Sequence, residues 1–164
     1  MYQPSAVMPN DSVSGWQPTP ARVLLEALKF AEVGPQDLLF DLGCGDGRVI
    51  VKAARLFGAQ AVGFDIDPQL LQETRRRIRR LGLHDYVRAR RQSMTRIPDL
   101  HRATVIFLFL PQTAVNRLKP IILRNCRKGT RVVSVASRFP NWLPDKQMLY
   151  RGRQATWWMG LWYV

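Results

Sequence analysis

The sequence predicts an α/β protein with a doubly wound, mostly parallel sheet of seven strands that ends in a C-terminal antiparallel hairpin. Short apolar runs alternate with segments of helical periodicity along most of the chain, a pattern typical of parallel sheets covered by helices on both faces. A glycine-rich turn joins the first apolar run to the next helical segment. Residues 147–164 break the alternation with two β-prone runs on either side of Gly152, which indicates a hairpin.

The individual elements follow from local composition, taken in chain order. Residues 1–20 contain four prolines among Ser, Asn and Gly, and we expect an extended arm there, ahead of one domain over residues 21–164. The first helix is expected at residues 21–33, with Thr19 as its cap and Pro20 in its first turn. Further helices are expected at residues 48–57, 68–81 and 112–127. Strands are expected at residues 38–41, 61–65, 86–90, 104–110, 131–137, 148–151 and 156–164.

Length and composition narrow the class of protein. The most apolar run, residues 104–110, is expected to be a central strand buried on both faces, and it is far too short to cross a bilayer. With 164 residues, 46% of them hydrophobic, the chain can bury a core without disulfides or structural metal. Neither Cys44 nor Cys126 stands in a metal-binding spacing with a histidine, so we expect reduced thiols and no metal. Residues 1–10 lack the features of a secretory signal, which predicts a cytoplasmic location.

The chain is strongly basic, with 25 Lys and Arg against 12 Asp and Glu and a formal net charge of +13. Such a field attracts anionic partners over long distances. One predicted helix carries arginines opposite its apolar side, at positions 75, 76, 77, 79 and 80. They predict either a solvated helix face, on which Glu73 pairs with Arg77, or a docking surface. Through Arg75, Arg76 and Arg79 that surface would contact RNA or an acidic protein segment.

The glycine-rich turn reads Asp41-Leu42-Gly43-Cys44-Gly45-Asp46-Gly47-Arg48. Glycines at alternate positions let the chain turn sharply and let a ligand lie against the main chain. The spacing differs from the G-x-G-x-x-G fingerprint of dinucleotide sites, and Asp41 stands at the end of the preceding strand. A carboxylate at that place repels a pyrophosphate and attracts a cation. The turn therefore points to a ligand with an ammonium or sulfonium group, and S-adenosylmethionine carries both.

A second buried run ends in another acid, Asp65, 18 residues after Gly47. This is about where a ribose-binding carboxylate belongs in such a βαβ unit. We therefore expect Asp65, followed by Ile66, to contact the ribose. Asp67 is instead expected to cap the helix that opens at Pro68.

These residues resemble the first two motifs of the seven-β-strand (class I) S-adenosylmethionine-dependent methyltransferases, which have a Rossmann-like fold. More narrowly, the sequence resembles the small protein-lysine methyltransferases related to the ATP synthase c-subunit lysine methyltransferase. The segments that carry this resemblance are residues 18–20, 41–48, 108–111 with Asn116, and 138–142. The resemblance implies S-adenosylmethionine as cofactor, a protein lysine as acceptor, and a cofactor site made of Asp41, Gly43, Cys44, Gly45, Gly47, Asp65, Ile66 and Ser93. Ser93 stands where the wider fold usually offers the adenine an acid or a polar pair.

The acceptor is expected at the carboxyl end of the sheet, where open α/β sheets bind ligands. Methyl transfer from a sulfonium depends largely on positioning, so it needs a neutral amine close to the methyl carbon and no strong base. Pro111 follows the central strand at this end, and Gln112 and Asn116 are placed to accept from the amine. Trp142 or Trp16 is placed to cover the alkyl chain of the acceptor. Core packing is the alternative for Trp142.

The sequence is also compatible with two other functions. The net charge favours an RNA methyltransferase, although the sequence lacks an Asn/Asp-Pro-Pro-aromatic motif for base amines and a catalytic cysteine pair. The non-enzymatic alternative is a nucleic-acid-binding protein that retains the methyltransferase fold. The C-terminal aromatic residues could stack on bases, but the alternation of a hairpin favours core positions for half of them. These residues are Trp157, Trp158, Trp162 and Tyr163.

Overall fold

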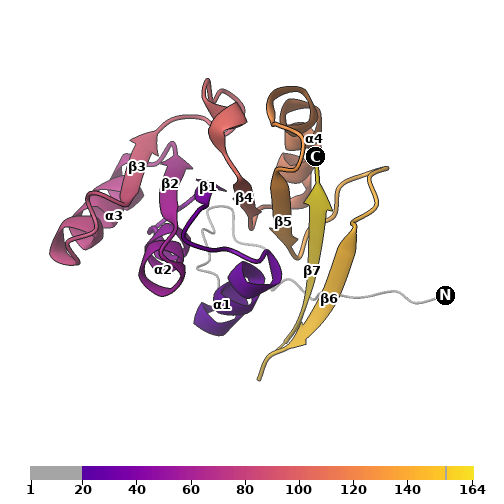
Figure 1. The fold of residues 1–164 in the computed structure, drawn as a ribbon, viewed down its shortest axis with the longest axis horizontal. Coiled ribbons are helices and arrows are strands. Elements are labelled where there is room, and N and C mark those ends of the chain that lie inside the picture. The colour runs from indigo at the N-terminus through magenta and orange to yellow at the C-terminus, as the bar shows by residue number, and fades with distance from the viewer. Residues whose placement is uncertain (1–19, 154) are drawn as a thin grey trace.

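A computed structural model describes residues 20–153 and 155–164 of the chain (Figure 1). Its helices are α1 (Ala21–Phe30), α2 (Arg48–Phe57), α3 (Pro68–Arg80) and α4 (Gln112–Asn125), with one short 3-10 helix, η1 (Leu100–Arg102). Its strands are β1 (Leu38–Leu42), β2 (Gln60–Asp65), β3 (Val87–Arg91), β4 (Val105–Leu108), β5 (Arg131–Val135), β6 (Lys146–Arg151) and β7 (Thr156–Tyr163). Each helix and strand expected beyond the N-terminal arm is present. The expected arm, with Trp16 and Thr19, lies outside the described residues.

The strands form one seven-stranded sheet in the order β3-β2-β1-β4-β5-β7-β6. β1 pairs in parallel with both β2 and β4, whereas β7 runs antiparallel to β5 and β6. The doubly wound fold and its C-terminal antiparallel hairpin are therefore confirmed. The chain leaves β1 toward β2 and β3 on one side and returns through β4 on the other, so the carboxyl end of β1 lies at the topological switch point where such sheets bind ligands.

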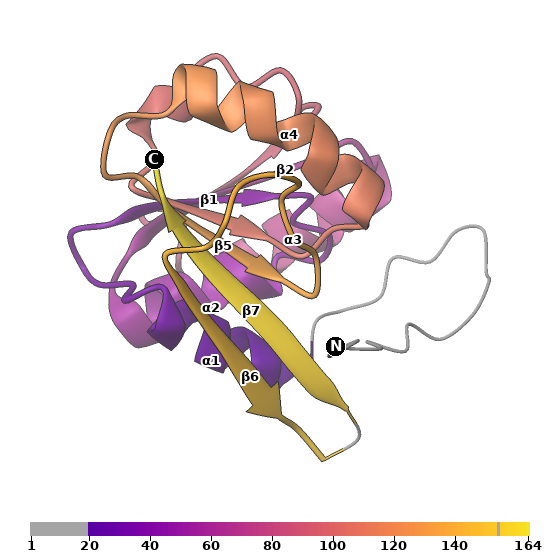
Figure 2. The same cartoon turned by 90° about the vertical axis from the view of Figure 1, so that its right-hand side faces the viewer.

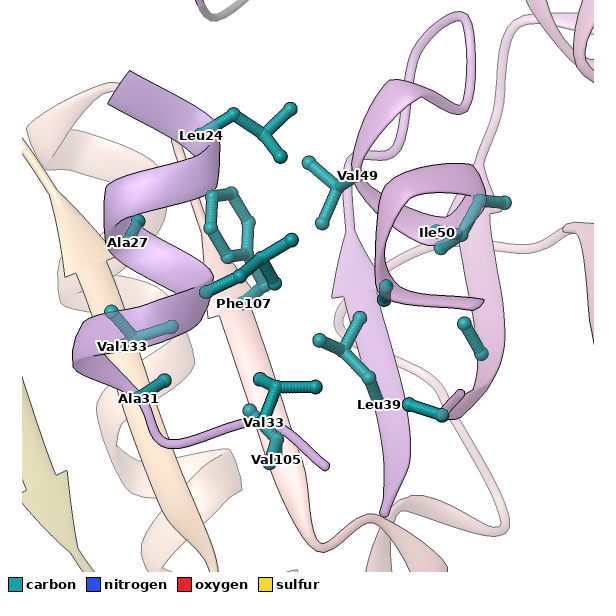
Figure 3. Packing of buried hydrophobic residues seen from close by; sticks show 14 of the residues in the cluster. Leu24, Ala27, Ala31, Val33, Leu39, Val49, Ile50, Val105, Phe107 and Val133 are labelled. Carbon is teal, nitrogen blue, oxygen red and sulfur yellow. The ribbon is translucent and has the colours of Figure 1, made fainter. Parts of the chain in front are cut away.

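Helices cover both faces of the sheet, α1 to α3 on one face and α4 on the other (Figure 2). Figure 3 shows how Leu24 of α1 and Val49 of α2 meet the sheet residues Leu39 and Phe107. On the opposite face α4 buries Val115, Leu118 and Ile122.

The central strand β4 is buried on both faces, as expected. Val105 and Phe107 point into the core beneath α1 and α2, while Ile106 and Leu108 belong to the core beneath α4. All four side chains have no exposed surface. Full burial of such a side chain contributes about 1.5–3 kcal/mol to stability. Because β4 supplies two of these side chains to each core, it stabilises the packing on both faces of the sheet.

Three local expectations need correction. α1 ends at Phe30 instead of residue 33, because the chain turns through Glu32 in a left-handed conformation with φ of 54°. Pro20 occupies the N-cap position of α1 and not its first turn, and makes no side-chain capping bond. Arg77 pairs with Asp46 at 3.3 Å and not with Glu73, because it reaches across to the glycine-rich turn.

The C-terminal aromatic residues largely belong to the core. Trp158 and Trp162 are 7% and 0% exposed, and their rings pack against each other with centroids 6.0 Å apart. Trp157 is half-buried against Phe109, whereas Tyr163 is 38% exposed. The expectation that the hairpin buries half of these rings is confirmed, and a base-stacking platform there is excluded for Trp158 and Trp162.

Within the described ranges, no helix is both long and apolar enough to cross a membrane. Over the same residues no three His, Cys, Asp or Glu side chains are grouped as a metal site would require. Cys44 and Cys126 are both free thiols, and burial raises the pKa of Cys126 to about 11.

Candidate functional site

The glycine-rich turn lies at the carboxyl end of β1 and uses its glycines for backbone conformation. Gly43, Gly45 and Gly47 have φ of 83°, 52° and 76°, a left-handed conformation that residues with a Cβ rarely adopt. The N–H groups of Gly43 and Cys44 donate to the Phe64 carbonyl at 2.8 and 3.0 Å. The turn is thereby fastened to the end of β2 before α2 begins.

Helix α3 holds the far side of the turn. The Thr74 hydroxyl donates to the Gly45 carbonyl at 2.9 Å, and Arg77 donates to the Asp46 carbonyl at 2.9 Å. A Cβ on Gly47 would overlap the Thr74 side chain, so only glycine permits this approach. The turn is therefore held in shape by a neighbouring element before any ligand binds.

Two further strand ends converge on Gly43. A Cβ at Gly43 would lie 2.8 Å from Leu110 Cδ2 and 3.7 Å from Met94 Cε. Leu110 follows β4 and Met94 follows β3, so the ends of β1, β3 and β4 meet at one place. Both side chains are only partly buried, which leaves an apolar rim around the turn.

Asp65 contacts the turn directly. Its carboxylate accepts from the Gly45 N–H at 2.9 Å and from the Asp67 N–H at 3.0 Å. Each carboxylate oxygen has a second lone pair, so Asp65 can still accept from two hydroxyls. Asp67 caps α3 by accepting from the N–H groups of Gln69 and Leu70, as expected.

Asp41 is the most unusual residue of the site. It is 3% exposed, and its Oδ2 is the buried side-chain oxygen that has no hydrogen-bond partner among the described residues. Burial raises the pKa of this carboxyl well above its ordinary value, and the charges of Asp65 and Asp46 raise it further. A buried acceptor without a donor is costly, so the site is built for a ligand that brings a donor or a positive charge. S-adenosylmethionine, with its ammonium and sulfonium groups, fits that requirement.

The other predicted cofactor residues, Cys44, Ser93 and Ile66, differ in how far they are buried. Cys44 is buried with its side chain close to Gly63, and burial raises the pKa of its thiol. Ser93 is half-buried and its hydroxyl lies 2.9 Å from that of Thr95. Ile66 is 68% exposed and is available to cover a ligand held by Asp65.

The predicted acceptor residues lie at the start of α4 and are fastened to the segment after β5. The Gln112 side chain donates to Asn116 Oδ1 at 2.7 Å and accepts from the Arg138 N–H at 3.2 Å. Ser137 donates to the Leu110 carbonyl at 2.7 Å. These bonds place the Leu110–Gln112 corner, which includes Pro111, against the end of β5.

The Trp142 ring packs on its neighbours. It lies 4.9 Å from the ring of Phe139 and 5.9 Å from that of Trp162, and it remains half-buried. Packing, the alternative considered for Trp142, is what the structure shows, while its contact with an acceptor stays a prediction.

Comparison with known proteins decides the family. The ANTKMT methyltransferase domain matches residues 41–146, more than half of the chain. The chain belongs to this methyltransferase family. The class I S-adenosylmethionine-dependent enzyme predicted from the glycine-rich turn and Asp65 is thereby confirmed.

Individual relatives of this methyltransferase agree on the fold and differ in their named substrates. It is 34% identical to a protein-lysine N-methyltransferase of Saccharolobus islandicus over 79% of this chain and 80% of the relative. It is 31% identical to the ATP synthase c-subunit lysine N-methyltransferase of Xenopus laevis over 66% of this chain, but it spans only 47% of that protein. The crystal structure of an RNA methyltransferase from Salinibacter ruber with S-adenosyl-L-homocysteine superposes with a TM-score of 0.82 at 34% identity, covering 90% of this chain and 94% of that one.

Sequence reasoning missed the residues that shape the site from outside the motifs. These are Thr74 and Arg77 of α3 and, after β3, Met94. One signal was available for Thr74, because a threonine stands on the otherwise apolar stripe of its helix and is 0% exposed. No local pattern marks Met94, since its contact with Gly43 depends on how three strand ends converge.

Proposed function

We propose that this methyltransferase transfers a methyl group from S-adenosylmethionine to the side-chain amine of a lysine in a protein. The observation that carries the proposal is the 34% identity to the Saccharolobus islandicus protein-lysine N-methyltransferase, which extends over 79% of this chain and 80% of the relative. The site agrees with it, because the predicted acceptor residues are neutral amides beside an apolar rim and suit an uncharged amine.

The cofactor would be held by the turn and two carboxylates. Bound S-adenosylmethionine supplies an electrophilic methyl group on a positively charged sulfur. Asp41 would provide the negative charge that its cationic groups need, and Asp65 would accept from the ribose hydroxyls. The left-handed glycines let the ligand approach the main chain.

The acceptor must reach the site as a free amine, because a protonated lysine has no lone pair for attack. Desolvation lowers the pKa of a lysine amine, and the partly buried Leu110 gives the corner an apolar side chain next to the glycine-rich turn. Gln112 Oε1 and Asn116 Oδ1 each accept one bond in this structure, and each has a second lone pair for an amine N–H. Their work is to orient the amine, which is the main requirement of this reaction.

RNA is the second candidate acceptor. The Salinibacter ruber relative is an RNA methyltransferase and has a TM-score of 0.82 with this chain. The net charge of +13 agrees with an anionic substrate. The protein acceptor is preferred because the predicted acceptor corner ends in Pro111 and Gln112 and lacks an Asn/Asp-Pro-Pro-aromatic sequence for a base amine.

A labelling experiment tests the proposal. The protein is incubated with radiolabelled S-adenosylmethionine and a lysate of its source organism, and the products are divided between protease and ribonuclease before counting. We expect label that protease removes and ribonuclease leaves, located on lysine by mass spectrometry.

The matched control is Asp41→Asn, which keeps the shape of the side chain and removes its charge. This variant should lose the label in both arms. Label that ribonuclease removes would overturn the lysine proposal in favour of RNA. Label that persists in the Asp41→Asn sample at the wild-type level would show that the incorporation does not depend on the described site.

A further inference from the structure

A basic groove follows the outer edge of the sheet where α3 lies beside β3 (Figure 1). The groove has a volume of about 470 Å³, and four of its lining residues are arginines: Arg75, Arg79, Arg88 and Arg90. His84, in the loop between α3 and β3, lines one end. β3 is an edge strand of the described sheet, so no further strand of that sheet covers this side.

The arginines approach the groove from two elements. Arg75 and Arg79 are four residues apart on α3 and therefore share one face of the helix. Arg88 and Arg90 alternate with Val87 and Ala89 on β3, so they share one face of the sheet at a spacing of about 6.6 Å. Positive charge thus flanks the edge strand on both sides and along its length.

Two of these arginines are engaged and two are free to bind. Arg75 donates to the Ala89 carbonyl at 3.1 Å and thereby covers part of the open edge. Arg90 pairs with Asp99 at 3.0 Å. Arg79 and Arg88 are exposed, and their side chains form no hydrogen bond or ion pair with another described residue.

The shape and composition of the groove favour a strand over a single anion. β3 extends over about 13 Å from its first to its last residue, which is longer than one phosphate group needs. Two exposed rings precede β3: the His84 side chain, which lines the groove, is 70% exposed, and Tyr86, directly before β3, is 52% exposed. Cationic grooves with exposed rings bind single strands through phosphate contacts and base stacking, whereas an acidic peptide gains nothing from the rings.

We propose that the α3–β3 groove binds single-stranded nucleic acid through Arg79 and Arg88, with Tyr86 stacking on a base. The helix separates this groove from the cofactor turn, because Thr74 and Arg77 of α3 contact the turn while Arg75 and Arg79 line the groove. The inference therefore goes beyond methyl transfer and does not depend on which molecule accepts the methyl group.

The test is fluorescence anisotropy with a labelled oligoadenylate over a range of salt concentrations. The double variant Arg79→Gln/Arg88→Gln should bind about tenfold more weakly, and the slope of log affinity against log salt should fall by about 1.4, the value for two lost phosphate contacts with a single strand. Tyr86→Ala should weaken binding without changing that slope. The matched control, Arg55→Gln/Arg124→Gln, removes the same charge at exposed positions on α2 and α4 and should bind like the wild type.

Each arm can overturn the proposal. Equal weakening in the Arg55→Gln/Arg124→Gln control would show that net charge alone attracts the oligonucleotide. Wild-type affinity in Arg79→Gln/Arg88→Gln would remove the groove from binding. Polyglutamate that competes as well as oligoadenylate would assign the groove to an acidic protein segment. Oligodeoxyadenylate in a parallel series distinguishes DNA from RNA, and preferential binding of either one supports a groove for single strands.

Discussion

A buried aspartate lies at each end of β1, and the two differ in whether their carboxylates have hydrogen-bond and ion-pair partners. Asp37, just before the strand, accepts from the Gly34 N–H at 2.8 Å and the Thr104 hydroxyl at 2.7 Å, and it pairs with the Arg131 guanidinium. Arg131 in turn donates to backbone carbonyls at the end of α1. At this amino end the buried carboxylate is matched by a guanidinium.

Asp41, four residues later, lacks such partners. It is even less exposed, at 3% against 8% for Asp37, yet its Oδ2 has no donor among the described residues and the charges that act on it are those of Asp65 and Asp46. The fold alone gains nothing from this arrangement, since the described residues offer Oδ2 no contact that its removal would cost. Asp37 therefore supports the fold through its partners, whereas the unpartnered Asp41 carboxyl agrees with its predicted role in the cofactor site.

The largest effect is expected at the amino end, where Asp37→Ala leaves the half-buried Arg131 without its partner. Removing one member of a buried ion pair costs about 3–5 kcal/mol of stability, and urea denaturation should show a decrease of that size in the free energy of unfolding. Cofactor affinity, measured without urea at a temperature where the variant is folded, should stay at the wild-type value. An unchanged denaturation midpoint would show that Asp37 does not stabilise the fold. Glu32→Ala, which removes an exposed pair with Lys146, is the control and should leave the midpoint unchanged.

At the carboxyl end, Asp41→Asn should have the opposite pattern. Loss of a charge-assisted contact of about 1.5–3 kcal/mol weakens S-adenosylmethionine binding on the order of 10- to 100-fold. The free energy of unfolding of the ligand-free protein should stay equal or rise, because the variant removes a carboxyl whose ionisation is opposed by burial and by the neighbouring acids. Isothermal titration calorimetry and urea denaturation measure the two quantities. A variant that is destabilised while it binds normally would place Asp41 with Asp37 as a structural residue.

The raised pKa of Asp41 predicts a pH dependence with a defined sign. Between the ordinary carboxyl pKa and the raised value, the folded protein holds a proton that the unfolded chain has released. The contribution of Asp41 to stability therefore decreases as pH rises through this window. A bound cation lowers the pKa again and expels the proton, so cofactor affinity should increase with pH by at most about tenfold per pH unit.

Calorimetry in two buffers of different ionisation enthalpy measures that released proton. The wild type should release a fraction of a proton on binding S-adenosylmethionine within the window, and Asp41→Asn should release less. Equal proton release by both proteins would assign the pH dependence to another group.

The smallest effect concerns the backbone beside the acceptor corner. Ala136 follows β5 with φ of 67°, a conformation that costs a residue with a Cβ about 1–2 kcal/mol. Ala136→Gly removes this cost, but it also raises the conformational entropy of the unfolded chain, which lowers the free energy of unfolding by about 0.4–1 kcal/mol. A net gain of about 0.5–1 kcal/mol in thermal or urea unfolding is expected from the difference, with unchanged cofactor affinity. Destabilisation would show that the Ala136 methyl group contributes more packing than its strain costs.

Much of this molecule could be predicted from sequence because the decisive signals are local. The periodicity of strands and helices depends on side chains only a few residues apart. The glycines at positions 43, 45 and 47 indicate a left-handed backbone conformation that only glycine adopts readily. The place of Asp67 before Pro68 predicts a cap, and Asp67 caps α3. The end of α1 could not be located to better than three residues, because the left-handed Glu32 that ends it has no strong local signature.

The order of strands and helices, the glycine-rich turn and the two acids Asp41 and Asp65 can all be recognised in the amino-acid sequence. The groups that these residues contact depend on the tertiary structure. It matched Asp37 with Arg131, 94 residues away, and brought Thr74 against Gly45. The physical reason is that hydrogen bonding and desolvation depend on neighbours in space. Two aspartates four residues apart therefore look alike in the sequence and differ entirely in the fold.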